Sequence, residues 1–464
     1  MSEHSVIIRE DEIAATLAGA GAPDPVRVRE ILAKAGVMQG LAPADVAVLM
    51  RTSAPELLQE LYATARRVKR DIYGNRLVLF APLYISNLCA NECLYCAFRA
   101  RNRAIVRRAL TQDEIAREVK ALIDQGHKRV LLVAGESYPR EGFQYVLDSI
   151  ATVYSVKSGP GEIRRVNANV APLTLDEFRR LKEARIGTYQ VFQETYHRAT
   201  YGQVHLGGKK RDYDWRVTAM DRAMEAGISD VGVGVLFGLA DWRFELLALM
   251  QHIAHLEARF GVGPHTISVP RLEPATGSDM ASRPPHAVAD DDFRKVIAIL
   301  RLAVPYTGII LSTRENPAMR RESLALGVSQ ISAGSRTNPG GYADGEETAA
   351  ASQFSLGDHR GLDEVIRDVA ALGYIPSFCT GCYRLGRTGK DFMDLAKPGE
   401  IKRHCDPNAV STFMEYLMDY AAPATREEGM RRIEQAVDGM EPGVQQTARR
   451  LLERVRGGQR DAYC

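Results

Sequence analysis

The alternation of short apolar segments with amphipathic helices after residue 75 constrains the fold of this chain most. Eight segments are rich in aliphatic residues, and the segments between them space apolar residues three and four apart. The predicted strands are residues 75–86, 128–136, 162–171, 188–196, 230–239, 265–275, 307–316 and 328–337. Eight such units over roughly 260 residues match the usual size of a (β/α)8 barrel. We therefore predict an α/β fold, a (β/α)8 TIM barrel, with its chemistry near the strand ends.

The barrel is predicted to occupy residues 76–345, with a helical part on either side. Residues 1–75 are predicted to be an N-terminal helical extension, because apolar residues in 24–36 and 54–74 have helical spacing. A Gly-rich and acidic loop follows the barrel. Residues 346–464 are predicted to be a mostly helical C-terminal domain that carries a second cysteine group.

The overall composition argues against several classes of partner. The chain has 60 Lys and Arg against 58 Asp and Glu, so its net charge is only +2, which gives no electrostatic reason to expect nucleic acid or a membrane. The N-terminus lacks a basic segment followed by an apolar core, so we expect no signal peptide. No apolar run reaches the ~18 residues of a membrane-spanning helix. We therefore expect a soluble cytoplasmic protein.

Three of the seven cysteines lie close together in the loop after the first predicted strand. The stretch "SNLCANECLYCAF" holds Cys89, Cys93 and Cys96. Soft thiolates suit zinc and iron–sulfur clusters. Structural zinc sites and electron-transfer clusters use four protein ligands, and no fourth cysteine lies nearby. Three thiolates on a four-iron cluster leave one iron open to a small molecule; the alternative is a zinc site completed by a distant histidine.

A second group of three cysteines lies beyond the predicted barrel, at Cys379, Cys382 and Cys405. A zinc ribbon would require a second pair of ligands, which this part of the chain lacks. An auxiliary iron–sulfur cluster with an open iron is the favoured interpretation, and metal-free cysteines are the alternative. Cys464, the last residue, matches no motif, and we expect it to be an exposed thiol without function.

The first loop resembles the signature of radical S-adenosylmethionine (radical SAM) enzymes, with Tyr95 in the aromatic position before the last cysteine. The resemblance implies that the reduced cluster splits SAM into methionine and a 5′-deoxyadenosyl radical. Gly135 and Glu136 match the family's Gly-Gly-Glu-type segment, which contacts the SAM amino group. Arg165 and Glu194 are weaker candidates for SAM contacts; a solvent-facing salt bridge is the alternative for each.

A narrower resemblance links the chain to the radical SAM tyrosine lyases of [FeFe]-hydrogenase maturation, the HydG family, which is related to 2-iminoacetate synthase. The segments that carry it are "GNRLVLFAPLYISNLC", "FQETYHRATY", "GPHTISVPRL", "STREN" and "CTGCYRLGRTGKDFM". The resemblance implies cleavage of the Cα–Cβ bond of L-tyrosine to p-cresol and dehydroglycine. It also implies conversion of dehydroglycine to carbon monoxide and cyanide at the auxiliary cluster. The implied product is an iron–carbonyl–cyanide–cysteine unit.

Further site residues follow from this narrower resemblance. His265 matches the residue proposed to bind a fifth, dangling iron of the auxiliary cluster; a structural histidine at a strand start is the alternative. Ser312 and Arg314 would hold the tyrosine carboxylate, because a guanidinium binds a carboxylate with two hydrogen bonds. The alternative for Arg314 is an ion pair with a neighbouring acid such as Glu315.

The implied cofactors are two [4Fe–4S] clusters, SAM and free L-cysteine. The implied partners are L-tyrosine, a reductant such as flavodoxin or ferredoxin, and other hydrogenase maturation proteins. Two other functions stay open. One is a 2-iminoacetate synthase or a lyase of another aromatic amino acid, and the other is a non-catalytic iron–sulfur carrier.

Overall fold

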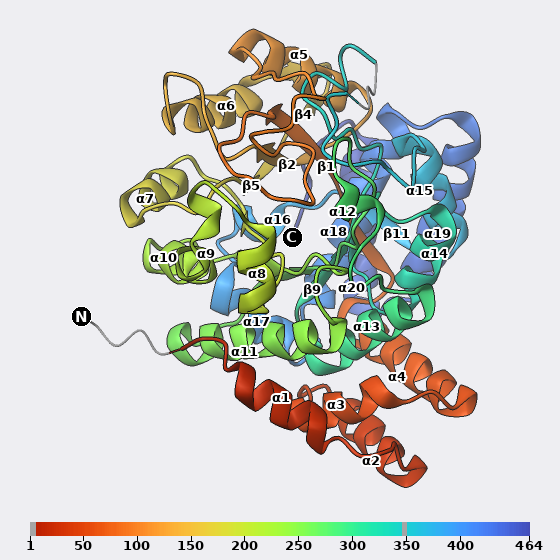
Figure 1. Ribbon diagram of the computed structural model, residues 1–464. Coiled ribbons are helices and arrows are strands. Elements are labelled where there is room, and N and C mark those ends of the chain that lie inside the picture. The colour runs from red at the N-terminus through yellow and green to blue at the C-terminus, as the bar shows by residue number, and fades with distance from the viewer. Residues whose placement is uncertain (1–5, 346–349) are drawn as a thin grey trace.

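Eight parallel strands form a closed ring in the computed structural model, which describes residues 6–345 and 350–464 (Figure 1). β10 pairs with β1, with Ser332 beside Phe80, and this pairing closes the ring. The predicted barrel is confirmed. The strands are β1 (Arg76–Ser86), β2 (Arg129–Ala134), β5 (Arg165–Asn169), β6 (Tyr189–Gln190), β7 (Val231–Gly234), β8 (Thr266–Ser268), β9 (Gly308–Leu311) and β10 (Gln330–Ser332).

The strands are continuously apolar because helices cover their outer face and side chains fill the ring. All six residues of β2 are buried. β6 is much shorter than the predicted 188–196, although the backbone amides of Val191 and Gln193 still donate to Gly232 and Gly234 of β7. Residues 191–193 therefore remain hydrogen-bonded to β7, although they no longer have regular strand geometry.

The helices around the ring begin and end largely where the sequence signals place them. Capping boxes join Thr111 to Glu114 and Thr174 to Glu177 at two helix starts. Between Tyr213 and Glu225 the chain forms two short helices that meet at Thr218. The helices of the barrel region are α5 (Gln112–Asp124), α6 (Gln144–Ser155), α7 (Leu175–Glu183), α8 (Arg198–Val204), α9 (Tyr213–Val217), α10 (Ala219–Glu225), α11 (Trp242–Phe260), α12 (Asp279–Ser282), α13 (Asp290–Ala303) and α14 (Pro317–Leu326).

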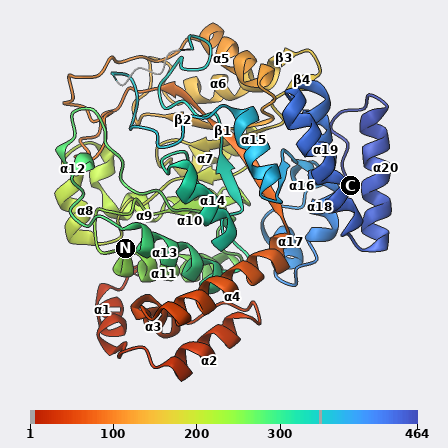
Figure 2. The same cartoon turned by 90° about the vertical axis from the view of Figure 1, so that its right-hand side faces the viewer.

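The N-terminal helices lie against the outside of the barrel (Figure 2). α4 places Leu57, Leu61, Ala65 and Val68 on one buried face and packs against α13 and α14. Residues 1–5 lie outside the described part of the chain. The helices of this region are α1 (Glu10–Gly19), α2 (Pro25–Ala35), α3 (Pro43–Arg51) and α4 (Pro55–Tyr73).

The C-terminal region adds one strand and several helices to the barrel. β11 (Ile375–Ser377) pairs in parallel with Arg76–Val78 of β1, before β2 begins to pair at Ala81. A strand of three residues is too short to show a hydrophobic period, so β11 was not predicted from the sequence. The hairpin of β3 (Lys157–Ser158) and β4 (Gly161–Glu162) was not predicted either. The predicted boundary between residues 345 and 346 touches residues 346–349, which lie outside the described residues.

The helices after the barrel form the second helical group seen at the right of Figure 2. α18 is the central helix of this group and packs against both α19 and α20. The helices are α15 (Leu362–Ala371), α16 (Gly381–Arg384), α17 (Gly389–Ala396), α18 (Lys402–Asp419), α19 (Pro423–Asp438) and α20 (Pro442–Arg456). Within the described ranges, no helix is both long enough and apolar enough to cross a membrane.

A buried ion-pair network joins α18 to the beginnings of two barrel strands. The Arg164 guanidinium lies 2.8 Å and the Lys128 ammonium 3.5 Å from the Glu415 carboxylate, and all three side chains are at most 1% exposed. Arg129 in β2 also donates to the backbone oxygen of Cys379 at 2.7 Å. These contacts fix the second cysteine group against the N-terminal end of the barrel.

We expect Glu415→Gln to destabilise the protein by about 3–5 kcal/mol, because it removes the buried carboxylate shared by Lys128 and Arg164 and leaves Arg164 only the Asp461 carboxylate, 3.5 Å away. Asp438→Ala breaks the exposed pair with Arg449 and serves as the control, with an expected cost below about 1 kcal/mol. Urea unfolding followed by circular dichroism measures both. Equal small losses in the two variants would contradict the structural role of Glu415.

Candidate active site

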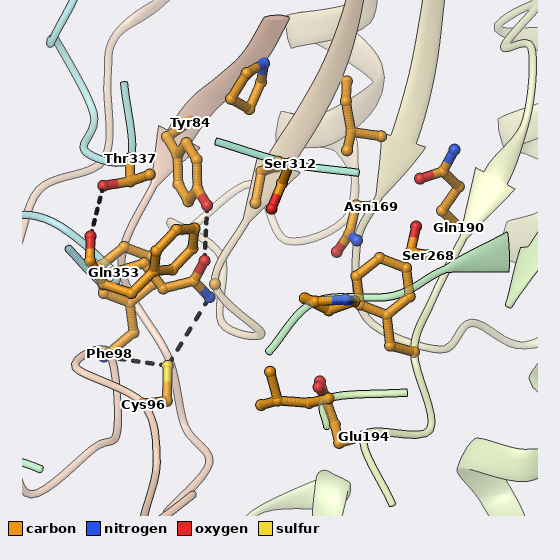
Figure 3. Close-up of a pocket in the computed structure, with 18 of the residues that line it drawn as sticks. Tyr84, Cys96, Phe98, Asn169, Gln190, Glu194, Ser268, Ser312, Thr337 and Gln353 are labelled. Carbon is orange, nitrogen blue, oxygen red and sulfur yellow. Dashed lines mark hydrogen bonds between the residues drawn. The ribbon is translucent and has the colours of Figure 1, made fainter. Parts of the chain in front are cut away.

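The first cysteine group lines a large cavity at the C-terminal ends of the barrel strands (Figure 3). Cys89, Cys93 and Cys96 all contribute to its wall. The backbone amide of Phe98 donates to Cys96 Sγ at 3.4 Å, and Gln353 Nε2 lies 3.9 Å from the same sulfur. Burial raises the pKa of all three thiols, to about 11 for Cys96. Binding to iron would deprotonate them.

The cysteine loop is held by the chain segments on both sides of it. Cys93 forms a β-bridge with His205, and the backbone amide of Leu94 donates to Val204 at 3.0 Å. Gly135, at the end of β2, packs so closely that a Cβ atom there would lie 2.1 Å from the Leu88 oxygen. Only glycine fits this approach, so the Gly135–Glu136 segment is fixed beside the cysteines.

Two carboxylates and two cations meet at one side of the cavity. Glu136 accepts hydrogen bonds from Asn91 Nδ2 at 2.6 Å and from the Arg216 guanidinium at 2.8 Å. Glu194 accepts from Lys210 Nζ at 2.7 Å, and Arg216 lies 3.6 Å from it. Burial acts to raise the pKa of Glu136, but Arg216 and Lys210 outweigh it and hold the carboxyl below its usual range. The predicted pair Glu136 and Glu194 is therefore brought together.

Arg216 and Lys210 were not among the residues predicted for this site. Arg216 lies in a segment that reads as an ordinary surface helix, and Lys210 lies in a Gly-Lys loop without a recognised motif. Glu194 has φ +72°, a left-handed conformation that is uncommon outside glycine and that clusters at functional sites. Tyr95 is buried nearby, with its hydroxyl 2.8 Å from His205 Nε2.

Ser312 and Arg314 face the same cavity from the end of β9 (Figure 3 labels Ser312). The Arg314 guanidinium lies 3.3 Å from the centre of the Phe354 ring, and its side chain makes no hydrogen bond or ion pair within the described part of the chain. Glu315 instead pairs with Arg271. The alternative of an Arg314–Glu315 pair is therefore wrong.

The cavity has a polar side, with the two carboxylates and two cations described above, and an apolar side. About 1390 Å³ of space is free of protein atoms here, with the open mouth included. Its far wall is apolar, with Phe80, Leu131, Val133 and Ile310. Tyr84 donates to Gln353 Oε1 at 2.7 Å and thereby orients the amide that faces Cys96, as Figure 3 shows.

The second cysteine group lines a smaller cavity at the opposite, N-terminal end of the strands. Cys379, Cys382, Cys405 and His265 all contribute to its wall. About 660 Å³ of space is free of protein atoms here, with the opening included. Gly381 N donates to Cys379 Sγ at 3.3 Å. The neighbouring Cys405 thiol lowers the pKa of Cys382, while Cys382 and burial raise the pKa of Cys405. His265 Nδ1 is buried without a hydrogen-bond partner among the described residues, 3.7 Å from Asp230. Burial lowers the pKa of His265, which favours the neutral, metal-binding imidazole.

Three arginines that the sequence analysis missed line this second cavity. Arg76, Arg129 and Arg387 each keep a buried guanidinium nitrogen without a hydrogen-bond partner in the described ranges. Asp230 is the carboxylate that lines the same cavity, and it accepts from Gly389 N. An anionic occupant, such as a cluster held by three thiolates, would complete this surface. No three His, Cys, Asp or Glu side chains of the described residues meet closely enough to hold a single metal ion.

The structure corrects the expectations for two residues. Arg165 lies at the beginning of β5, and its guanidinium stacks on the Tyr383 ring at 3.6 Å, so it belongs to the end of the barrel opposite the first cysteine group. Its expected contact with SAM is therefore wrong. Cys464 is half-buried rather than exposed; its backbone oxygen accepts from Arg387, and its thiol lies 3.8 Å from the His404 oxygen.

Comparisons with known proteins agree with this architecture. The Radical SAM superfamily matches residues 83–249, and the Biotin and Thiamin Synthesis associated domain matches residues 268–375. The 2-iminoacetate synthase of Escherichia coli (strain K12) is 35% identical over 347 residues, which cover 75% of this chain and 89% of the relative.

Two solved structures of a maturase of the [FeFe]-hydrogenase, HydG, are similar to the chain over nearly its whole length. One is 46% identical, with a TM-score of 0.95, and covers 99% of this chain and 100% of the other. The HydG of Carboxydothermus hydrogenoformans is 40% identical, with a TM-score of 0.83, and the match covers 96% of this chain and 97% of the other. The chain is therefore a radical SAM lyase, which implies a [4Fe–4S] cluster and SAM, and it belongs to the family of HydG and 2-iminoacetate synthase.

Proposed function

We propose that this protein cleaves the Cα–Cβ bond of L-tyrosine and builds an iron–carbonyl–cyanide–cysteine unit for the hydrogenase active site. The first products are p-cresol and dehydroglycine. Dehydroglycine, HN=CH–COO⁻, has the composition of carbon monoxide, cyanide and one water molecule, so its breakdown balances without a further reactant. Both ligands of the iron product thus come from tyrosine.

The observation that carries the proposal is the second cysteine group with His265 at the opposite end of the same barrel. These cysteines lie beyond residue 375, outside both matched family regions. The solved HydG structures cover this part of the chain as well. A barrel with two three-thiolate sites supports a reaction in two stages.

For the first stage, Cys89, Cys93 and Cys96 would hold the [4Fe–4S] cluster that binds SAM. When bound and reduced, this cluster supplies the 5′-deoxyadenosyl radical from SAM. Glu136, fixed by Asn91 and Arg216, would accept a hydrogen bond from the SAM amino group, with Glu194 and Tyr95 nearby. Fixed carboxylates orient a cationic amine without reorganisation cost.

L-Tyrosine would bind between Arg314 and the apolar wall. The Arg314 guanidinium and the Ser312 hydroxyl would hold its carboxylate, while Phe80, Leu131 and Val133 would surround its ring. Burial lowers the pKa of Arg314, so an anionic partner would compensate a costly buried cation.

For the second stage, Cys379, Cys382 and Cys405 would hold an auxiliary [4Fe–4S] cluster, and His265 would bind the additional iron with free L-cysteine. The three arginines would offset the negative charge of this group. The two cavities share strands: Gly308 of β9 lines the second, and Ile310 lines the first. Keeping both stages within one barrel would prevent loss of carbon monoxide and cyanide.

The runner-up function is a 2-iminoacetate synthase, which the similarity to the Escherichia coli relative favours. Anaerobic reconstitution with iron, sulfide, SAM, tyrosine and cysteine separates the two. Formation of p-cresol without carbon monoxide or cyanide would exclude the maturase function. Absence of SAM cleavage after reduction would point to a non-catalytic carrier. Under the proposed function, the other partners are a reductant and further hydrogenase maturation proteins.

We expect Arg314→Gln to lower kcat/KM for p-cresol formation by about 10- to 100-fold, because a charge-assisted hydrogen bond contributes about 1.5–3 kcal/mol. The reduced cluster should keep its EPR signal. Arg321→Gln, at an exposed arginine of α14 paired with Asp368, is the matched control and should leave the rate unchanged. An unchanged kcat/KM in Arg314→Gln would exclude its role in substrate binding.

Replacing Cys379 and Cys382 together by alanine should spare p-cresol formation and abolish the iron product. Infrared spectroscopy of carbonyl and cyanide bands measures the product, and chromatography measures p-cresol. Cys89→Ala should instead abolish SAM cleavage and all later products. Retention of carbonyl and cyanide bands in the double variant would refute this division between the two sites.

A further inference from the structure

Two surface segments beside the first cysteine loop carry exposed cations. Arg101 and Arg103 lie on one segment, and Lys209 and Arg211 lie on the other. None of these four side chains forms an ion pair or hydrogen bond within residues 6–345 and 350–464.

Both segments contact the cysteine loop directly. The backbone amide of Arg101 donates to the Glu92 carboxylate at 2.9 Å, and that of Ala100 donates to the Asn91 oxygen at 2.8 Å. On the other side, Leu206 N donates to the Glu92 oxygen at 2.8 Å, and Lys210 N donates to Asn91 Oδ1 at 3.0 Å. A protein bound to these segments would therefore be separated from the cysteine loop only by the residues of the two segments.

The cations of this surface outnumber its exposed acids. Glu92 is buried and pairs with Arg99, whereas Asp212, which accepts a hydrogen bond from Trp215 N, is an exposed acid beside Arg211. Asp279 of α12 is an exposed acid on an adjoining segment, where Ser278 donates to the Leu94 oxygen. Since the whole chain carries a net charge of only +2, four unpaired cations here form a local excess.

An exposed apolar side chain lies beside this positive surface. Leu206 follows His205, the residue bridged to Cys93, and is 49% exposed. An exposed large apolar residue in a segment with exposed cations is typical of a protein interface, where an apolar centre is buried and a polar rim provides steering.

We propose that this surface, defined by Arg101, Arg103, Leu206, Lys209 and Arg211, docks a small acidic one-electron carrier protein that reduces the cluster at the first cysteine loop. The carrier loses one electron and the cluster gains it; no bond forms or breaks. The inference rests on the proposed position of this cluster and not on the identity of the substrate.

The test compares two reductants in the reconstituted enzyme. A reduced acidic flavodoxin and a reduced ferredoxin, in separate arms, must reach the docking surface, whereas dithionite reaches the cluster without docking. The variants are Arg101→Glu with Arg103→Glu, and Lys209→Glu with Arg211→Glu. The readouts are the rate at which the EPR signal of the reduced cluster appears and the 5′-deoxyadenosine formed from SAM, neither of which requires tyrosine cleavage.

We expect both variants to lower the second-order rate constant with a protein carrier by about tenfold or more, because steering by opposite charges raises association rates by roughly 10- to 1,000-fold. The rate with dithionite should stay unchanged, which also shows that the variants fold and bind the cluster. Added salt should lower the wild-type rate towards that of the variants.

The matched control reverses two exposed arginines of α20, with Arg449→Glu and Arg450→Glu. Figure 2 shows α20 on the side of the molecule opposite α8 and α12. This control should keep the full rate with the carrier. The proposal is overturned if neither carrier reduces the wild-type cluster, if the docking variants keep the wild-type rate, or if they lose the dithionite rate equally.

Discussion

The pairing of β1 with three other strands holds both candidate sites in one frame. Its first residues pair with β11, its middle with β10, and its last residues with β2. β1 leads into the loop of Cys89, and β11 leads into Cys379, so one strand positions both cysteine groups. A shift of one residue in the pairing of β1 with β2 or β11 would turn the side chains of the shifted strand to the other face of the sheet. The register of these pairings is therefore strongly specified.

The two ends of the barrel differ in charge. At the first site, Glu136 and Glu194 balance Arg216 and Lys210, and Arg314 is left as an unpaired cation in the same cavity. This arrangement suits ligands that carry both amino and carboxylate groups. At the second site, three arginines exceed the single lining carboxylate of Asp230, which suits an anionic group. The polar atoms left without partners at the second site are a cost to the folded chain that an anionic occupant would remove.

The barrel and both cysteine groups could be predicted from the sequence because each depends on local patterns. Strand periodicity, capping residues such as Thr111, and the spacing of Cys89, Cys93 and Cys96 are all visible over short stretches. Arg216 and β11 could not be predicted, because each gains its role from contacts between distant segments. Arg216 joins Glu136 across 80 residues, and β11 pairs with a strand almost 300 residues earlier.

The expected contact of Arg165 with SAM could have been excluded from its position in the sequence. Arg165 and His265 both lie at the beginning of predicted strands, whereas Glu136, Glu194 and Arg314 lie at or after strand ends. In a parallel barrel all strand beginnings meet at one end and all strand ends at the other. Applied consistently, this rule assigns Arg165 to the end that holds His265 and the second cysteine group. The position of a residue along its strand thus separates the two sites better than its charge does.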